Sequence, residues 1–430
     1  MFREGYHELS VPHRGAFCRM RFMASSGLRG DELRLVLGTG GAYALRMLGL
    51  YMALPILATW AGSLPGATHV KVGLAVGAYG LTQAIFQVPF GILGDLVGRR
   101  FVILLSLAVF AAGSAVVASA HDIDVVILGR LLQGAGAMAS TIIALIGDGT
   151  RPEVRTRAMA LFGVVLGLSF AGGFLAGPQV AARVGVSGVF AAGCGLSILA
   201  AVVFQVLVPA RLLSRGARDS AAASGPAAPT WSWSAASAIL REPALLVLDA
   251  GIGVLHACVT GAFVVIPFLL RDHLPDERLW VAYGPAIALG MAAMAWASHR
   301  AERPERARSI LALGGAACVV GLAGLALFHR ALVPVAVSLA VFVVGFAMLE
   351  PVLAALVTRH ADRASRGTAA GVFNLTQFLG VFFGGLLAGR LLSVGRWAPF
   401  SAMALLVLAW LATLRWLRGS RASSDRPAAT

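Results

Sequence analysis

The sequence predicts an all-α membrane protein in which twelve transmembrane helices form two pseudo-symmetric six-helix bundles. Three observations lead to this fold class: the composition, the lengths of the apolar runs, and one long polar break near the middle. Of the 430 residues, 58% are hydrophobic and only 13% are charged, with a mean hydropathy of +0.82. Soluble domains carry nearer a quarter charged residues. The composition therefore excludes soluble enzymes, collagen-like chains and disordered chains.

The apolar runs are long enough to cross a bilayer, because about 20 apolar residues span the hydrocarbon core. Six runs precede the polar break and six follow it. The break, residues 209–242, contains a stretch of low complexity, 221–229, and is predicted to be a linker. The runs are 36–60, 72–94, 101–119, 125–147, 158–182, 188–208, 243–269, 280–298, 309–328, 332–357, 367–389 and 398–415. We expect a tail over 1–35, bundles over 36–208 and 243–416, and a tail over 417–430.

The distribution of basic residues predicts the orientation. The loops on the linker side contain 16 Arg and Lys residues and the opposite loops contain seven. Cytoplasmic loops carry the excess of positive charge, so the linker and both termini are predicted to be cytoplasmic. Residues 1–34 contain six Arg and no apolar run of a signal peptide, which favours a tail that stays inside. A later start at Met23 is the alternative for the beginning of the chain.

The distribution of charge and the spacing of the cysteines argue against nucleic-acid binding, a disulfide framework and a metal site. The net charge of +15 comes from Arg residues spread over short loops, which suits lipid headgroups better than a nucleic-acid interface. The four Cys residues lie far apart, and we expect neither a disulfide framework nor a metal site. We expect no cofactor, with the proton gradient as the energy source. The expected partners are the lipid bilayer, protons and a small-molecule substrate, and the expected state is a monomer.

A short repeat supports duplication of the two halves. The residues Gly-Gly-Phe-Leu-Ala-Gly at 172–177 are echoed by Gly-Gly-Leu-Leu-Ala-Gly at 384–389, each in the fifth helix of its half. Two related halves with a site between them are typical of secondary transporters.

The loop after the second predicted helix carries a charged motif. It contains Gly91, Asp95, Gly98, Arg99 and Arg100. The glycines allow a tight turn and close helix approach. Asp148, at the end of the fourth helix, lies where it can pair with the Arg cluster.

This motif resembles the cytoplasmic signature of the major facilitator superfamily. Arg130 with Gln133 in helix 4 resembles a motif of its proton-coupled drug antiporters, and Gly173, Gly177 and Pro178 resemble the antiporter motif of helix 5. Ala181 and Ala182 replace a usual Gly pair, which weakens the antiporter inference. The segments 45–55 and 79–91 are similar to YajR-type transporters of bacterial inner membranes. That family can carry a soluble domain after helix 12, for which a chain ending at Thr430 leaves no room.

The resemblance implies alternating access and roles for particular residues. Asp95, Arg99 and Asp148 are expected to form a charge network that bears on conformational switching. The alternative is a purely structural clamp. The three helix 5 residues are expected to pack against a neighbouring helix.

Five ionisable residues lie deep inside predicted spans, where a charge costs at least ~2.5–3.5 kcal/mol. They are Arg46, Arg130, Asp249, His256 and Glu350. They fall on helices 1, 4, 7 and 10, which the resemblance places around a central cavity. Glu350 is the first candidate for the proton carrier and Asp249 the second, and His256 can also titrate near neutral pH. Arg46 lies at a depth from which it could pair with either acid across the cavity. The alternatives are an inert ion pair for either acid and a packing role for His256.

Neutral polar residues complete the predicted cavity lining. Gln83 and Gln87 are four residues apart and share a helix face. Hydrogen bonding between helices is the alternative for each residue of the set. The predicted lining consists of Arg130, Gln133, Tyr79, Gln83, Gln87, Asn374 and Gln377.

These observations favour proton-coupled antiport that exports small amphipathic or drug-like compounds from the bacterial cytoplasm. Proton-coupled uptake of a nutrient and a non-transporting sensor or scaffold on the same fold remain alternatives. An enzyme is not expected, because the sequence has no hydrolase or membrane-protease motif and its single Lys, Lys71, lies outside any phosphate-binding loop.

Overall fold

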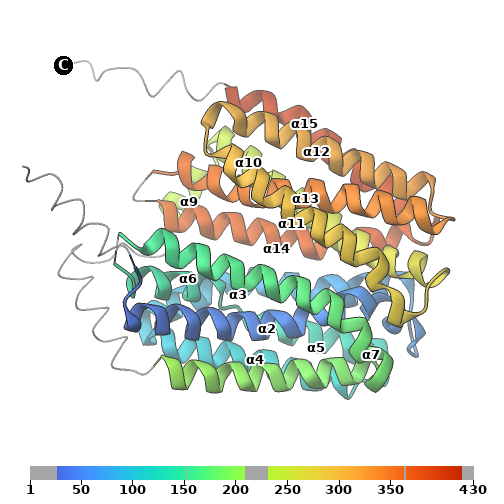
Figure 1. The fold of residues 1–430 in the computed structure, drawn as a ribbon, viewed down its shortest axis with the longest axis horizontal. Coiled ribbons are helices and arrows are strands. Elements are labelled where there is room, and N and C mark those ends of the chain that lie inside the picture. Colours follow the sequence, from blue (N-terminus) through green and yellow to red (C-terminus); the bar gives the residue numbers. More distant parts are fainter. Residues whose placement is uncertain (1–26, 152, 209–230, 363–364, 419–430) are drawn as a thin grey trace, which may run out of the picture.

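The computed structural model describes residues 27–151, 153–208, 231–362 and 365–418, and within these ranges it is helical with no strand. The all-α prediction is confirmed. Figure 1 shows long helices running roughly side by side along one direction. The first half contains α2 (Gly30–Ser63), α3 (His69–Val97), α4 (Arg99–Ala118), α5 (Ile123–Ala135), α6 (Ala139–Asp148) and α7 (Arg155–Leu207). The second contains α9 (Trp233–Ile239), α10 (Pro243–Arg271), η1 (Asp276–Arg278), α11 (Trp280–Ala301), α12 (Pro304–Leu327), α13 (Leu332–His360), α14 (Arg366–Leu391), α15 (Ala398–Thr413) and η2 (Leu414–Arg418).

The longest helix, α7, crosses the membrane twice. Its 53 residues would extend about 80 Å as one straight rod, more than twice the hydrocarbon thickness. Gly185 interrupts it with φ 74° and ψ 171°, a backbone conformation that favours glycine. The predicted gap between the fifth and sixth runs contains this residue. Eleven helical spans in the described chain are apolar enough to cross a membrane, and α7 counts twice, so the predicted twelve crossings are confirmed.

The fourth crossing differs from the prediction of one continuous helix over 125–147. It consists of α5 and α6, separated by Gly136, Ala137 and Met138. Gly136 has ψ 50° and Met138 has ψ −2° with φ −137°, so neither continues the helix. The Ser106 hydroxyl donates to the freed carbonyl of Ala137 over 3.0 Å. The break is stable inside the membrane because side chains of neighbouring helices bond the freed carbonyls.

The two halves form separate bundles that meet along α3 and α14. In Figure 1 the blue-to-green half lies below the yellow-to-red half, with α14 next to the lower bundle. Glycines make this contact close: a Cβ added to Gly77 would lie 2.9 Å from the Phe382 carbonyl oxygen, and one added to Gly385 would lie 2.9 Å from Gly77 Cα. These residues belong to the half of each helix that the arginine count assigns to the extracytoplasmic side. The bundles are therefore closed against each other in that half.

The duplicated glycine segments allow close helix packing in both bundles. A Cβ on Gly173 would lie 2.7 Å from Tyr51 Cβ of α2, and a Cβ on Gly384 would lie 2.5 Å from Ala257 Cα of α10. The fifth helix of each half thus packs closely on the first. Gly177 also meets α2, at Met52, and Pro178 is buried beside it.

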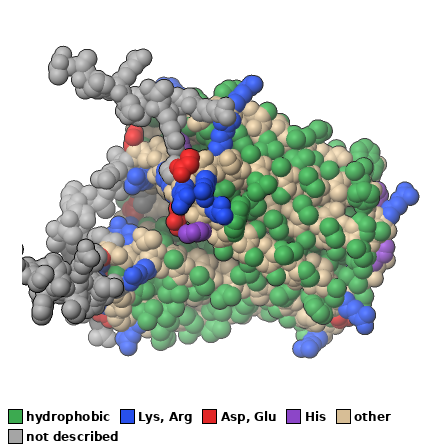
Figure 2. Space-filling view, turned by 45° about the horizontal axis from the view of Figure 1, so that its top comes forward, with side chains coloured by type: hydrophobic (Ala, Val, Ile, Leu, Met, Phe, Trp, Pro, Cys, Tyr) green, Lys and Arg blue, Asp and Glu red, His purple; other side chains and the backbone are tan. Residues whose placement is uncertain are grey.

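The surface matches a membrane protein. Figure 2 shows a broad belt of hydrophobic side chains around the middle, with charged side chains gathered at the two ends. Residues 1–26, 209–230 and 419–430, which include most of the predicted tails and linker, lie outside the described residues. Helix α2 begins at Gly30, six residues before the predicted start, and the described end of the linker forms α9.

Candidate functional site

Three of the predicted site residues come together in the second bundle. His256 of α10, Glu350 of α13 and Gln377 of α14 form a polar cluster within the membrane span. His256 Nε2 lies 4.0 Å from Glu350 Oε1 and 2.8 Å from Gln377 Nε2. His256 Nδ1 lies 3.2 Å from the Ile252 carbonyl, which can only accept, so Nδ1 carries the proton and Nε2 accepts from the Gln377 amide. A neutral imidazole thus faces the Glu350 carboxyl group.

The Glu350 side chain reaches accessible space between the bundles. It is 42% exposed although it lies well inside α13. It also interacts electrostatically with the hydroxyl of Tyr51, which belongs to α2 of the other bundle. The contact with His256 of the second bundle and the electrostatic interaction with Tyr51 of the first place the carboxylate on the side of the second bundle that faces the first. Protons or a substrate can therefore reach it from that space.

An aromatic cluster closes this space toward the predicted extracytoplasmic side. Tyr51 and Phe170 of the first bundle pack edge to face at 5.0 Å, and Phe174 continues the stack. Phe174 then meets Phe263 of α10 at 5.0 Å and Tyr283 of α11 at 5.9 Å. Phe174, Phe263 and Tyr283 are all buried. The aromatic packing therefore closes the bundles against each other in this half.

Asp249, the second candidate carboxyl group, lies in a different environment. It is 4% exposed, and neither carboxyl oxygen has a hydrogen-bond partner among the described residues. It lies on the same side of α10 as His256, two turns closer to the predicted cytoplasmic end. The structure places it out of contact with the accessible space that Glu350 reaches.

Arg46 does not form the expected ion pair with Glu350 or Asp249 in this structure. Its Nη2 donates to the Gly136 carbonyl over 2.9 Å, and its guanidinium lies 4.6 Å from the centre of the Phe110 ring. Both partners belong to the first bundle. Depth along the helix allows a pair with either acid, but the side chain points into its own bundle.

Arg130 and Gln133, predicted to line the cavity, form a buried network within the first bundle. Arg130 donates to the carbonyls of Ala75 and Val76 over 3.1 and 3.4 Å, and to Gln133 Oε1 over 2.7 Å. Gln133 Nε2 donates to the Ser114 hydroxyl over 2.8 Å. The network joins α5 to α3 and α4, so in this state it links helices, and a contact with substrate stays a prediction.

The other predicted lining residues divide between the two bundles. Gln83 and Gln87 are buried and hydrogen-bonded to each other over 3.4 Å. The Tyr79 ring stacks on the Arg130 guanidinium at 5.2 Å and meets Phe378 of the other bundle at 6.4 Å. Asn374 is half-buried on α14, one turn before Gln377. Of the predicted lining residues, only Gln377 belongs to the polar cluster around Glu350.

The structure brings together the charged residues of the predicted switch. Arg99 pairs with Asp95 at 3.6 Å and forms a shorter ion pair with Asp148 at the end of α6. Gly98, at φ 99°, makes the sharp turn between α3 and α4 that places Arg99 there. Gly91 approaches the Ser140 hydroxyl of α6.

Arg100 bonds elsewhere, to Gln205 and to the Val208 carbonyl, and so ties the same turn to the end of α7.

A second ion pair, which the sequence did not predict, lies at the predicted cytoplasmic end. Both oxygens of Glu32, in the first turn of α2, accept from the Arg151 guanidinium over 2.8 and 3.1 Å. The Arg29 backbone N–H donates to the same carboxylate over 2.7 Å. The hydrogen bond from Glu32 raises the pKa of Arg151. No motif indicated this pair, because the two residues are far apart in sequence and Arg is common in every loop at the predicted cytoplasmic end.

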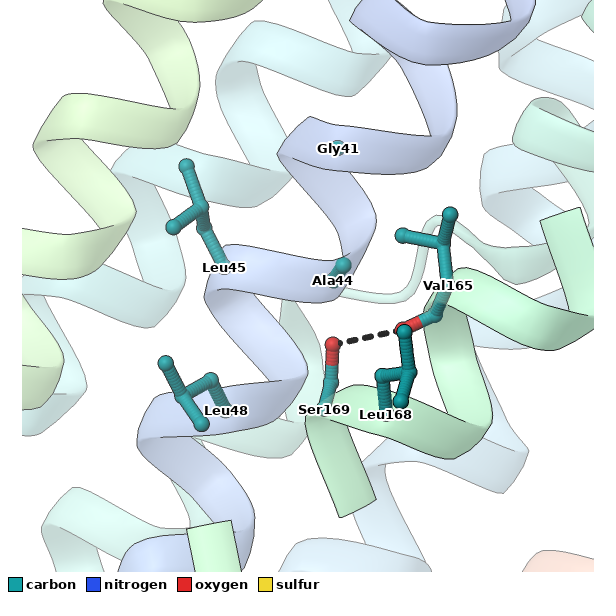
Figure 3. Close-up of a pocket in the computed structure, with 7 residues that line it drawn as sticks. All are labelled: Gly41, Ala44, Leu45, Leu48, Val165, Leu168 and Ser169. Carbon is teal, nitrogen blue, oxygen red and sulfur yellow. Dashed lines mark hydrogen bonds between the residues drawn. The ribbon is translucent and has the colours of Figure 1, made fainter. Parts of the chain in front are cut away.

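A groove between α2 and α7 is separate from the polar cluster. Figure 3 shows the groove, of about 340 Å³, lined by apolar side chains and by Ser169, whose hydroxyl donates to the Val165 carbonyl over 2.9 Å. Val165 and Phe174 are nine residues apart and therefore lie on opposite sides of α7, since a helix turns about 100° per residue. The groove thus faces away from the bundle interface and has no titratable lining residue.

Comparisons with known proteins agree with this geometry. The sequence model of the Major Facilitator Superfamily matches residues 39–385. The chain is 35% identical over 383 residues to the inner membrane transport protein YajR of Escherichia coli (strain K12), covering 88% of this chain and 82% of that protein. It is 27% identical over 359 residues to a class G tetracycline resistance protein of Vibrio anguillarum, covering 78% and 86%. A bacterial homologue of the human lysosomal transporter Spinster, crystallised inward-facing and occupied, superposes with a TM-score of 0.72 at 13% identity, covering 94% of this chain and all of that one.

Proposed function

Since the chain belongs to the major facilitator superfamily of membrane transporters, we propose that it exports small amphipathic compounds by proton-coupled antiport. It is a multi-pass transporter of the bacterial inner membrane, and its role is transport, not catalysis. In the proposed orientation both termini lie in the cytoplasm, and the protein acts as a monomer. The energy comes from protons that enter as substrate leaves.

One observation carries the proton-coupling part of the proposal: the accessible Glu350 carboxyl group between the bundles, beside neutral His256. A carboxyl group in such a place can bind a proton from one side and release it to the other when the bundles rock. Substrate and proton then compete for the same space, since a polar or cationic group of the substrate is favoured by the ionised carboxylate and disfavoured by the protonated one. This competition is what antiport requires.

The export direction is supported by the relatives and the helix 5 motif. One relative is a tetracycline resistance protein, and Gly173, Gly177 and Pro178 resemble the antiporter motif, although Ala181 and Ala182 replace its usual Gly pair. The charged turn at Asp95, Arg99 and Asp148 is proposed to take part in switching between the two states. It lies at the predicted cytoplasmic end, opposite the half in which α3 and α14 are in close contact.

The proposal is tested with purified protein in liposomes that contain a pH-sensitive dye. A panel of lipophilic cations, organic anions and sugars is added under an imposed proton gradient. The expected result is proton movement triggered by at least one class of compound and lost in Glu350→Gln. Glu302→Gln is the matched control, because its carboxylate lies on the exposed surface at 70% exposure. Proton movement that persists in Glu350→Gln, or is absent with every compound in folded protein, contradicts the proposal.

A further inference from the structure

The break in the fourth crossing lies against a buried positive charge. Arg46 of α2 is 0% exposed and contacts the break directly, through the hydrogen bond from Nη2 to the Gly136 carbonyl. Its guanidinium also lies over the Phe110 ring of α4. The charge is thus enclosed within the first bundle, between α2, α4 and the junction of α5 and α6. It lies apart from the interface cluster of Glu350, His256 and Gln377.

This charge is not neutralised by the described protein. Arg46 Nε and Nη1 have no hydrogen-bond partner, and Arg46 makes no ion pair within the described ranges. Taking a charged group out of water is costly, and a single cation–π contact offsets only part of that cost. One carbonyl and one ring are therefore insufficient for a guanidinium that has two donors unused. A group of opposite charge is the partner that would balance it.

The break supplies further features that favour an anion. Helix α6 has ten residues and begins at the break, inside the membrane, so its first N–H groups have no intrahelical acceptor and form its positive end. Two buried side chains near this end have unpartnered polar atoms: Thr141 Oγ1 in the first turn of α6, and Gln87 Nε2 on α3, one turn before Gly91, which approaches Ser140. Half-helix N-termini of this kind hold anionic groups in discontinuous transmembrane helices.

We propose that Arg46 and the start of α6 form a binding site for a small anion, a halide or a carboxylate group. The anion would accept from Arg46 Nε and Nη1 and would balance the charge that the bundle encloses. It would also stabilise the broken helix, because the break exposes the positive end of α6 within the membrane. The site is independent of the proposed proton coupling, since it lies within one bundle and its occupation requires no gradient.

The first test measures thermal unfolding of the purified full chain in detergent. Chloride replaces gluconate at constant ionic strength, and the melting temperature of the wild type is expected to rise with chloride and then saturate. Benzoate in place of chloride distinguishes a carboxylate site from a halide site, and a response to either supports the proposal. Arg46→Gln is expected to lose the response, whereas Arg157→Gln, an exposed Arg at the start of α7, should retain it.

A second test uses the wild type alone and therefore does not depend on a variant that folds. Crystals soaked in bromide should show an anomalous peak next to the Arg46 guanidinium if the site takes halides. If only benzoate stabilises the protein, its carboxylate should appear in the same place. The proposal is overturned if neither anion stabilises the wild type and no density for either appears at Arg46, or if Arg46→Gln responds to the anion as the wild type does.

Discussion

At the scale of single residues, the two candidate carboxyl groups are distinguished by their access to the space between the bundles. Glu350 is 42% exposed and faces His256, whereas Asp249 is 4% exposed with no hydrogen-bond partner among the described residues. A proton carrier must exchange protons with water in at least one state. In this state Glu350 meets that condition and Asp249 does not.

This difference predicts how a hydrophobic carbodiimide labels the protein, because the reagent modifies protonated carboxyl groups that it can reach. Treatment of the protein in membranes should label Glu350 several-fold more than Asp249, as measured by peptide mass spectrometry. Most of the labelling should therefore be lost in Glu350→Gln and should persist in Asp249→Asn. Preferential labelling of Asp249 would instead make it the accessible acid and reverse the assignment.

At the scale of elements, the turn between α3 and α4 is held by ion pairs to α6. Arg99 pairs with Asp95 and Asp148, and Arg100 ties the same turn to the end of α7. All of these contacts lie within the first bundle. They fix the shape of the surface that must meet the second bundle when the predicted cytoplasmic side closes.

Breaking this clamp should slow the transport cycle more than it destabilises the fold. Partly exposed ion pairs contribute only about 0–1 kcal/mol to stability, so Asp95→Asn should express and melt like the wild type. Its transport rate in liposomes should fall several-fold, because the turn no longer presents a fixed surface. Asp124→Asn is the control, since Asp124 forms an exposed ion pair with Lys71 at the opposite end. An unchanged transport rate in Asp95→Asn would mean that the clamp has only a structural role.

At the scale of the whole molecule, one buried hydroxyl group destabilises the aromatic contact between the bundles and so favours their separation. The Tyr283 hydroxyl is buried and has no hydrogen-bond partner among the described residues, while its ring packs on Phe174 and Phe263. A buried polar group without a partner costs about 1–3 kcal/mol. Separation of the bundles would hydrate this hydroxyl, so the cost applies to the closed contact only.

Removing the hydroxyl should therefore stabilise the closed contact. In Tyr283→Phe, spin-label distances between the predicted extracytoplasmic ends of the two bundles should shift toward the short population, by an amount that corresponds to about 1–3 kcal/mol. Tyr43→Phe is the control, since Tyr43 packs on Phe162 within the first bundle. A shift toward the long distances in Tyr283→Phe would show that the hydroxyl stabilises the contact.

The fold was predictable because it depends on apolar length and on loop charge, which are properties of the sequence. The switch contacts were also predictable, since Asp95 and Arg99 are one turn apart and Asp148 ends a helix on the same side. The cluster of His256, Glu350 and Gln377 could not be predicted, because it depends on how three helices are rotated about their axes. The same rotation sends Arg46 into its own bundle, which no estimate of depth along the helix reveals.

The break at Gly136 was missed for a related reason. The sequence around it is apolar and reads as one continuous span, and Gly alone does not end a transmembrane helix. The partners that stabilise the break, Arg46 and Ser106, come from other helices.

In the proposed mechanism, Glu350 couples the movement of protons to that of substrate. The most direct measurement uses liposomes and a transported compound to compare exchange at equal pH with accumulation driven by a pH gradient. Glu350→Gln should retain exchange, because the bundles can still rock around a neutral side chain, but should no longer accumulate substrate. Accumulation that follows the pH gradient in Glu350→Gln as it does in the wild type would show that Glu350 does not couple the two movements.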